Sequence, residues 1–198
     1  IVLNNSLKYY GGQSSFGESI PIACVGIISK VCMIFFSFVI GISQGLQPIV
    51  SFNYGAGNYK RVKKAYKLAL FASFIISTVA FVMCQVFPRQ IISLFGDGSE
   101  AYYQFGIRYF RIYMLFIGIT FIQPITSNFF TAIGKPVKGV FLSLTRQILF
   151  LIPLILILPL FLGIDGILYA GPIADFTAVT TATVMAVLEF RHKEYKEV

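Results

Sequence analysis

The chain has 198 residues, of which 57% are hydrophobic and only 12% are charged. A soluble domain carries about 25% charged residues, so this composition excludes an ordinary water-soluble globule and favours a membrane protein whose apolar side chains face lipid. The net charge of +8 does not indicate a nucleic-acid partner, because the basic residues stand in short clusters between long apolar runs.

Five apolar stretches are long enough to cross about 30 Å of hydrocarbon as helices. The last two are separated only by a short turn around Gly163, which predicts an antiparallel hairpin. The residues before Gly11 are interpreted as the end of an earlier helix. We therefore predict an all-α membrane protein that forms a single transmembrane domain over 1–198, with about five full helices plus the end of a sixth. The predicted spans are 20–49, 65–87, 107–133, 138–162 and 165–189.

Basic residues cluster in three segments that an odd number of spans would place on one side of the membrane. This bias predicts that those segments, and with them the C-terminus, are cytoplasmic. The opposite side is predicted to carry one substantial loop, 88–106. Aromatic side chains where the next helix enters are interpreted as interface anchors: Tyr102, Tyr103, Phe105, Tyr109 and Phe110. The basic residues are Lys60, Arg61, Lys63, Lys64 and Lys67, then Lys135 and Lys138, then Arg191, Lys193 and Lys196.

Polar side chains inside the spans recur at helical spacing, so each set should form one stripe that faces protein or a water-filled cavity. The stripe of the last span consists of small residues around Asp175, which allow close helix packing. We predict a substrate or ion pathway along these stripes, with Lys30, Gln44, Gln47, Gln123, Asn128 and Asp175 as its candidate residues. The stripes are Gly26, Lys30, Ser37, Gly41, Gln44 and Pro48; Thr120, Gln123, Ser127 and Thr131, with Asn128 beside them; and Gly171, Asp175, Ala178, Ala182 and Ala186.

Lys30 and Asp175 are each about 15 Å deep when counted from the external ends of their spans. Because isolated ions near the midplane are unfavourable, we predict an ion pair or a shared polar network between these two residues. Such a pair is either an intramembrane charge that changes protonation during transport or a structural element, and the sequence leaves both open. Arg146 is closer to the cytoplasmic end, where snorkelling to the interface explains it as well as a functional role does.

The sequence carries no pattern typical of an enzyme or of a metal site. The only histidine, His192, is in the charged tail, and Gly55-Ala56-Gly57 lacks the Lys-Ser/Thr that completes a phosphate-binding loop. We therefore expect a protein that is not an enzyme and has no bound cofactor.

The run from Gly41 to Val62, GISQGLQPIVSFNYGAGNYKRV, resembles a characteristic segment of the multidrug and toxic compound extrusion (MATE) family. Shorter matches are Leu3 to Gly12, Ala132 to Pro136 and Gly166 to Asp175. The resemblance implies a secondary active exporter with two six-helix lobes, of which this chain is the C-terminal lobe. It further implies alternating access, coupling to H⁺ or Na⁺, and small cationic amphipathic drugs as substrates.

The expected partners are the N-terminal lobe of the same polypeptide and the lipid bilayer, in a bacterial plasma membrane. The span 107–133 lacks the acidic residue of some sodium-coupled members, which leaves Asp175 as the deeply embedded acid and the coupling ion open. Two alternatives remain. One is a lipid-linked saccharide flippase of the same superfamily, which predicts more basic residues along the cavity than Lys30 and Arg146. The other is an inactive, truncated membrane protein.

Overall fold

A computed structural model of the chain describes residues 2–191, and the elements in that range are helical. The elements are α1 (Val2–Gly12), α2 (Ser19–Gly55), α3 (Tyr59–Val86), α4 (Pro88–Ser93), α5 (Glu100–Tyr113), α6 (Ile117–Thr120), α7 (Ile122–Ala132), α8 (Pro136–Leu144), the π-helical segment η1 (Thr145–Leu151), α9 (Ile152–Leu162) and α10 (Ile164–Phe190).

Five helical stretches within the described residues are long and apolar enough to cross a membrane. They are Ser19–Gly55, Tyr59–Val86, Glu100–Ala132, Pro136–Leu162 and Ile164–Phe190. Together with α1, they confirm the predicted all-α membrane fold. The helices extend beyond several predicted bounds, because polar residues such as those of Tyr59–Lys64 continue a helix past the apolar run.

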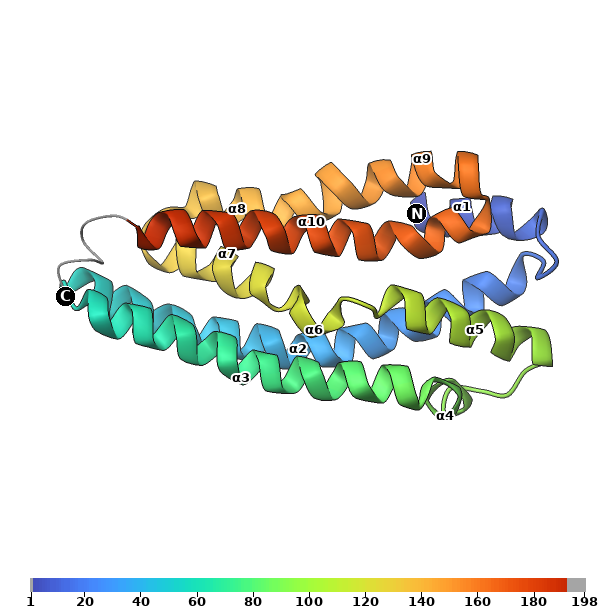
Figure 1. Cartoon of the computed structure of the whole chain (residues 1–198), viewed down its shortest axis with the longest axis horizontal. Helices are drawn as coiled ribbons and strands as arrows, with labels where there is room; N and C mark the ends of the chain where they lie inside the picture. The colour runs from blue at the N-terminus through green and yellow to red at the C-terminus, as the bar shows by residue number, and fades with distance from the viewer. Residues whose placement is uncertain (1, 192–198) are drawn as a thin grey trace.

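The helices form an elongated antiparallel bundle (Figure 1). The neighbouring helices α2 and α3 run along its lower edge, while α8, η1 and α9 pair with α10 along its upper edge. The segments α5 to α7 run between these two pairs. The α2–α3 turn, the α7–α8 turn and the end of α10 lie at the same end, as the charge pattern requires. The side of the membrane that this end occupies stays a prediction, and Lys193 and Lys196 lie outside the described residues.

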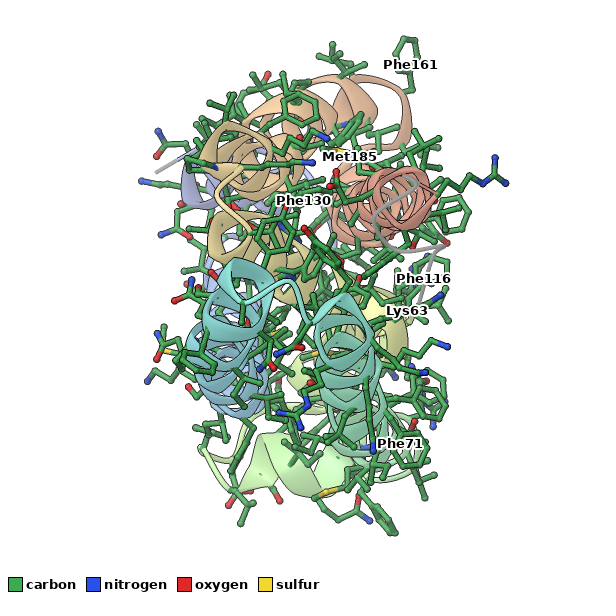
Figure 2. All side chains as sticks on the ribbon, turned by 90° about the vertical axis from the view of Figure 1, so that its left-hand side faces the viewer. Lys63, Phe71, Phe116, Phe130, Phe161 and Met185 are labelled. Carbon is green, nitrogen blue, oxygen red and sulfur yellow. The ribbon has the colours of Figure 1, made fainter. Side chains whose placement is uncertain are left out.

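Large apolar side chains cover the outside of the bundle as well as its inside. Phe130 is fully buried and points toward the interior, whereas Phe71 and Phe161 are 61% and 80% exposed and point outward (Figure 2). An exposed apolar belt of this kind is unfavourable in water and is expected of a surface that contacts lipid.

The structure contradicts the prediction that the aromatic residues of α5 anchor the membrane interface. Tyr103, Phe105, Tyr109 and Phe110 are buried and belong to a core cluster with side chains of α2 and α10. The prediction was wrong because it used their position along the chain and not the face of α5 on which they lie. These rings hold together the end of the bundle that lies opposite the α2–α3 turn.

The predicted external loop 88–106 is mostly helical. Pro88 stands in the first turn of α4, where its missing N–H costs nothing. Ser99 caps α5, since its hydroxyl oxygen accepts a hydrogen bond from the backbone N–H of Tyr102 at 3.3 Å. Only a short connection between α4 and α5 is therefore irregular.

Two of the spanning stretches are interrupted near their middle. The third is divided into α5, α6 and α7, with turns at Met114–Phe116 and at Phe121. The fourth contains η1, which ends just before Pro153. Because proline cannot donate a backbone N–H to the preceding turn, it favours a local widening of the helix there. These interruptions lie beside the polar residues described next.

Candidate functional site

A polar pocket of about 230 Å³ opens between α2, α7, α8 and η1. Of the six predicted pathway residues, Gln123 and Asn128 line it. Most of its other polar lining comes from the α8–η1 segment, from which the sequence analysis selected no residue. The lining residues are Phe36, Gln123, Pro124, Ser127, Asn128, Ser143, Arg146 and Gln147.

Asp175 pairs with Arg146 and not with Lys30. Nε of Arg146 lies 2.5 Å from Oδ1 of Asp175, and the carboxyl-bearing residue is only 4% exposed. Tyr113 of α5 lies beside the same guanidinium and interacts with it. The predicted Lys30–Asp175 pair is therefore wrong, and snorkelling does not explain Arg146.

The physical reason for the error is the reach of arginine. Counting residues placed Arg146 at a different depth from Asp175, but its long side chain spans about one helical turn of 5.4 Å. The antiparallel packing of η1 against α10 then brings the two groups together. Lys30, by contrast, lies exposed on α2.

A hydrogen-bonded chain of neutral side chains joins α2 to α7 beside the pocket. Nε2 of Gln47 donates to Oδ1 of Asn128 at 3.1 Å, and Nδ2 of Asn128 donates to Oγ of Ser43 at 2.6 Å. Ser43 in turn donates to the backbone carbonyl of Pro124 at 3.1 Å. Pro124 stands in the first turn of α7, so this bond ties α2 to the place where the interrupted helix resumes.

The opposite wall of the pocket is fixed by bonds between α7 and α8. Nε2 of Gln123 donates to the carbonyl of Leu142 at 2.8 Å. Oγ of Ser127 bonds the carbonyl of Gly139 and Oγ of Ser143, both at 2.7 Å. A Cβ at Gly139 would lie 2.7 Å from the Ser127 carbonyl oxygen, so only glycine permits this close approach of the two helices.

The small-residue stripe of α10 is confirmed as a packing face. Gly171, Asp175, Ala178, Ala182 and Ala186 are all buried. Asp175 thus points at protein, as predicted, although it lies behind Arg146 and does not line the pocket.

The predicted pathway residues fall into three places. Gln123 and Asn128 line the pocket, and Gln47 joins it through Asn128. Asp175 forms an ion pair with Arg146 on the side away from the pocket. Lys30 and Gln44 lie exposed on a separate stripe of α2. Sequence reasoning missed Ser143, Arg146 and Gln147, although Gly139, Ser143, Arg146 and Gln147 recur at helical spacing on one face of their span.

The pocket offers amides, hydroxyls and one guanidinium, which suits reversible binding by hydrogen bonds and charge. Its single charged lining residue is Arg146, and none of its lining residues is a carboxylate. Within residues 2–191, no three His, Cys, Asp or Glu side chains come together as a metal ion requires.

A family model described as MatE matches residues 14–157. A curated relative, the FAD transporter of Shewanella oneidensis, is 23% identical over 158 residues, covering 78% of this chain and 34% of the relative. The chain thus spans about a third of that relative's length.

Solved structures share the fold. An outward-facing multidrug resistance MATE transporter of the MOP superfamily superposes with a TM-score of 0.86 at 20% identity, covering 100% of this chain and 43% of the other. A MOP superfamily transporter from Pyrococcus furiosus, described as having a binding pocket of reverse polarity, gives 0.83 at 19% identity, covering 95% and 41%. The match of the family model over most of the chain, with this shared fold, means that the chain belongs to the MATE family of membrane transporters.

Proposed function

We propose that this chain is the C-terminal lobe of a secondary active transporter that exports amphipathic organic compounds in exchange for H⁺ or Na⁺. The observation that carries the proposal is the pocket at Gln123, Asn128 and Arg146, a set of polar groups at membrane depth in a lobe whose outside is apolar. Polar groups at such depth are costly unless they face protein or an aqueous path. The N-terminal lobe of the same polypeptide would close the path from the other side, in a bacterial plasma membrane, with the C-terminus cytoplasmic.

Cationic amphipathic drugs are the first candidate substrates, as the family resemblance implies. Aromatic and amide side chains can hold such compounds without a full counter-charge. The exposed stripe of α2 that carries Gln44 offers them a second polar surface, separate from the pocket.

Organic anions are a second candidate, because the guanidinium of Arg146 faces the pocket while its counter-charge, Asp175, lies outside the lining. Arg146 is the single charged lining residue, and guanidinium groups bind phosphate and carboxylate through bidentate hydrogen bonds. The similarity to a curated protein named FAD transporter points in the same direction, since that compound carries a pyrophosphate. A lipid-linked saccharide flippase has less support, because one basic lining residue is few for a pyrophosphate-linked lipid.

Transport by the full-length polypeptide in proteoliposomes tests the proposal. An imposed H⁺ or Na⁺ gradient should drive export of ethidium, of FAD or of both, and the ion that drives it is the coupling ion. Replacing Arg146 and Asp175 together, as Arg146→Gln with Asp175→Asn, removes the cation without leaving an unpaired acid. Loss of FAD transport with retained ethidium transport would favour the anion, while the absence of gradient-driven movement of either compound would contradict the proposal.

A further inference from the structure

A second cavity, of about 520 Å³, opens between α2 and α3 on a part of the surface that the transport proposal does not use. Its walls are apolar and include small residues, Gly45 on α2 and Ala65, Ala69 and Ala72 on α3. Two basic side chains, Arg61 and Lys64, stand at one end. We call this cavity the α2–α3 groove.

We propose that the α2–α3 groove binds an anionic phospholipid, with one acyl chain between the two helices and the phosphate at Arg61 and Lys64. The inference goes beyond the proposed function and does not depend on what the protein transports.

The length of the groove fits one leaflet of a bilayer. Along α3 it runs from Arg61 to Ala72, which at about 1.5 Å per residue is about 16 Å. Half of the hydrocarbon thickness is about 15 Å. An acyl chain entering beside the two cations would therefore reach the midplane where the groove ends.

The residues that the structure describes do not compensate the charge at the mouth of the groove. Among residues 2–191, Arg61 and Lys64 belong to none of the ion pairs, and both are exposed. They stand in the first two turns of α3, where the helix dipole adds positive potential. A lipid phosphate at this level would meet two cations and the positive end of a helix.

Asn53 adds an unused hydrogen-bond acceptor at the same end of the groove. Its Nδ2 donates to the carbonyl of Ile49 at 2.8 Å, whereas its Oδ1 is buried and has no partner within residues 2–191. A buried acceptor without a donor is unfavourable. A hydroxyl of a phosphatidylglycerol headgroup would supply the missing donor, which makes this lipid the one we expect.

Native mass spectrometry of the detergent-purified, full-length protein tests the inference by titration with phosphatidylglycerol and with phosphatidylcholine of the same chains. We expect the anionic lipid to bind more tightly. Each basic residue near a lipid phosphate contributes about 1 kcal/mol, so Arg61→Gln with Lys64→Gln should weaken phosphatidylglycerol binding about thirtyfold.

The matched control for charge is Lys60→Gln with Lys63→Gln. It removes two charges from the same turns of α3, at residues that do not line the groove; Lys63 is labelled in Figure 2. Equal weakening by the two pairs, or equal binding of both lipids to the unmodified protein, would overturn the inference.

The acyl chain is tested by filling the groove. A Cβ at Gly45 meets nothing within 4 Å, so Gly45→Leu adds bulk inside the groove without a clash at the backbone. Gly41→Leu, on the same helix but outside the groove, is its control, and gel filtration reports the folding of both. We expect only Gly45→Leu to lower binding. Unchanged binding, or displacement of the lipid by inorganic phosphate alone, would mean that the site holds an anion and no acyl chain.

Discussion

Arg146 and Asp175 form an ion pair that joins η1 to α10 inside the lobe, with Nε 2.5 Å from Oδ1. The two partners differ in exposure, since 23% of the Arg146 side chain is accessible but only 6% of the Asp175 side chain. The arginine can reach the water of the pocket, whereas the carboxylate depends on the arginine. This asymmetry decides how the pair responds to mutation.

Replacing Arg146 should destabilise the protein more than replacing Asp175. Arg146→Leu leaves a buried carboxylate without its partner, at a cost of about 3 kcal/mol, whereas Asp175→Leu leaves a guanidinium that the pocket can hydrate. The double variant should recover most of the loss, because it leaves neither charge without its partner. Thermal unfolding of the purified full-length protein measures this order. Arg89→Leu, which breaks the exposed Arg89–Glu100 pair, is the control and should have little effect.

Glu189 should be a larger determinant of stability than its place near the chain end suggests. It is 1% exposed and pairs with both Lys135 and Lys138, so it ties the α7–α8 turn to the end of α10. Glu189→Gln leaves two cations facing a neutral amide, and we expect a loss of about 2 kcal/mol. The same thermal assay checks it, with the exposed acid in Glu100→Gln as the control. Equal unfolding temperatures for the two variants would contradict the prediction.

Gly171 is predicted to be intolerant of any side chain. A Cβ there would overlap the ring of Tyr113, which lies beside Arg146. We expect Gly171→Ala to cost about 1–3 kcal/mol and to displace Arg146 from the pocket. Gly26→Ala, where a Cβ meets nothing within 4 Å, should be neutral or slightly stabilising. Unfolding temperatures report the cost, and a crystal structure of the variant would report the position of Arg146.

The fold could be predicted from the sequence because its signals are local. About twenty apolar residues span a membrane whatever their neighbours, and residues spaced three or four apart over 171–186 must share one helix face. Each of these inferences needs only one helix at a time.

The site could be predicted only in part, because partners depend on how different helices pack. The sequence put Asp175 on a protein-facing stripe, but selecting Arg146 over Lys30 required the crossing of η1 with α10 and the reach of one side chain. The prediction that the aromatic residues of α5 anchor the membrane interface was wrong for the same reason. Aromatic residues are common both at a membrane interface and in a buried core, so their presence alone does not decide between the two. Only the packing of α5 against α2 and α10 separates the two alternatives.

The exposed polar stripe on α2 gives a final prediction, about the environment of that face in the full-length transporter. Lys30, Ser37, Gly41 and Gln44 are all exposed on one side of the helix. A lysine near the bilayer midplane that faced lipid would cost about 3 kcal/mol, so this side should face water between the lobes.

We expect Ser37→Cys to react with a membrane-impermeant maleimide. Phe71→Cys replaces an exposed apolar residue on α3, and it should stay unlabelled because lipid covers it. The unmodified protein sets the background, since Cys24 and Cys84 are buried and Cys32 is half-buried. Labelling at residue 71 but not at residue 37 would place the polar stripe against protein or lipid and would remove Lys30 and Gln44 from the substrate pathway.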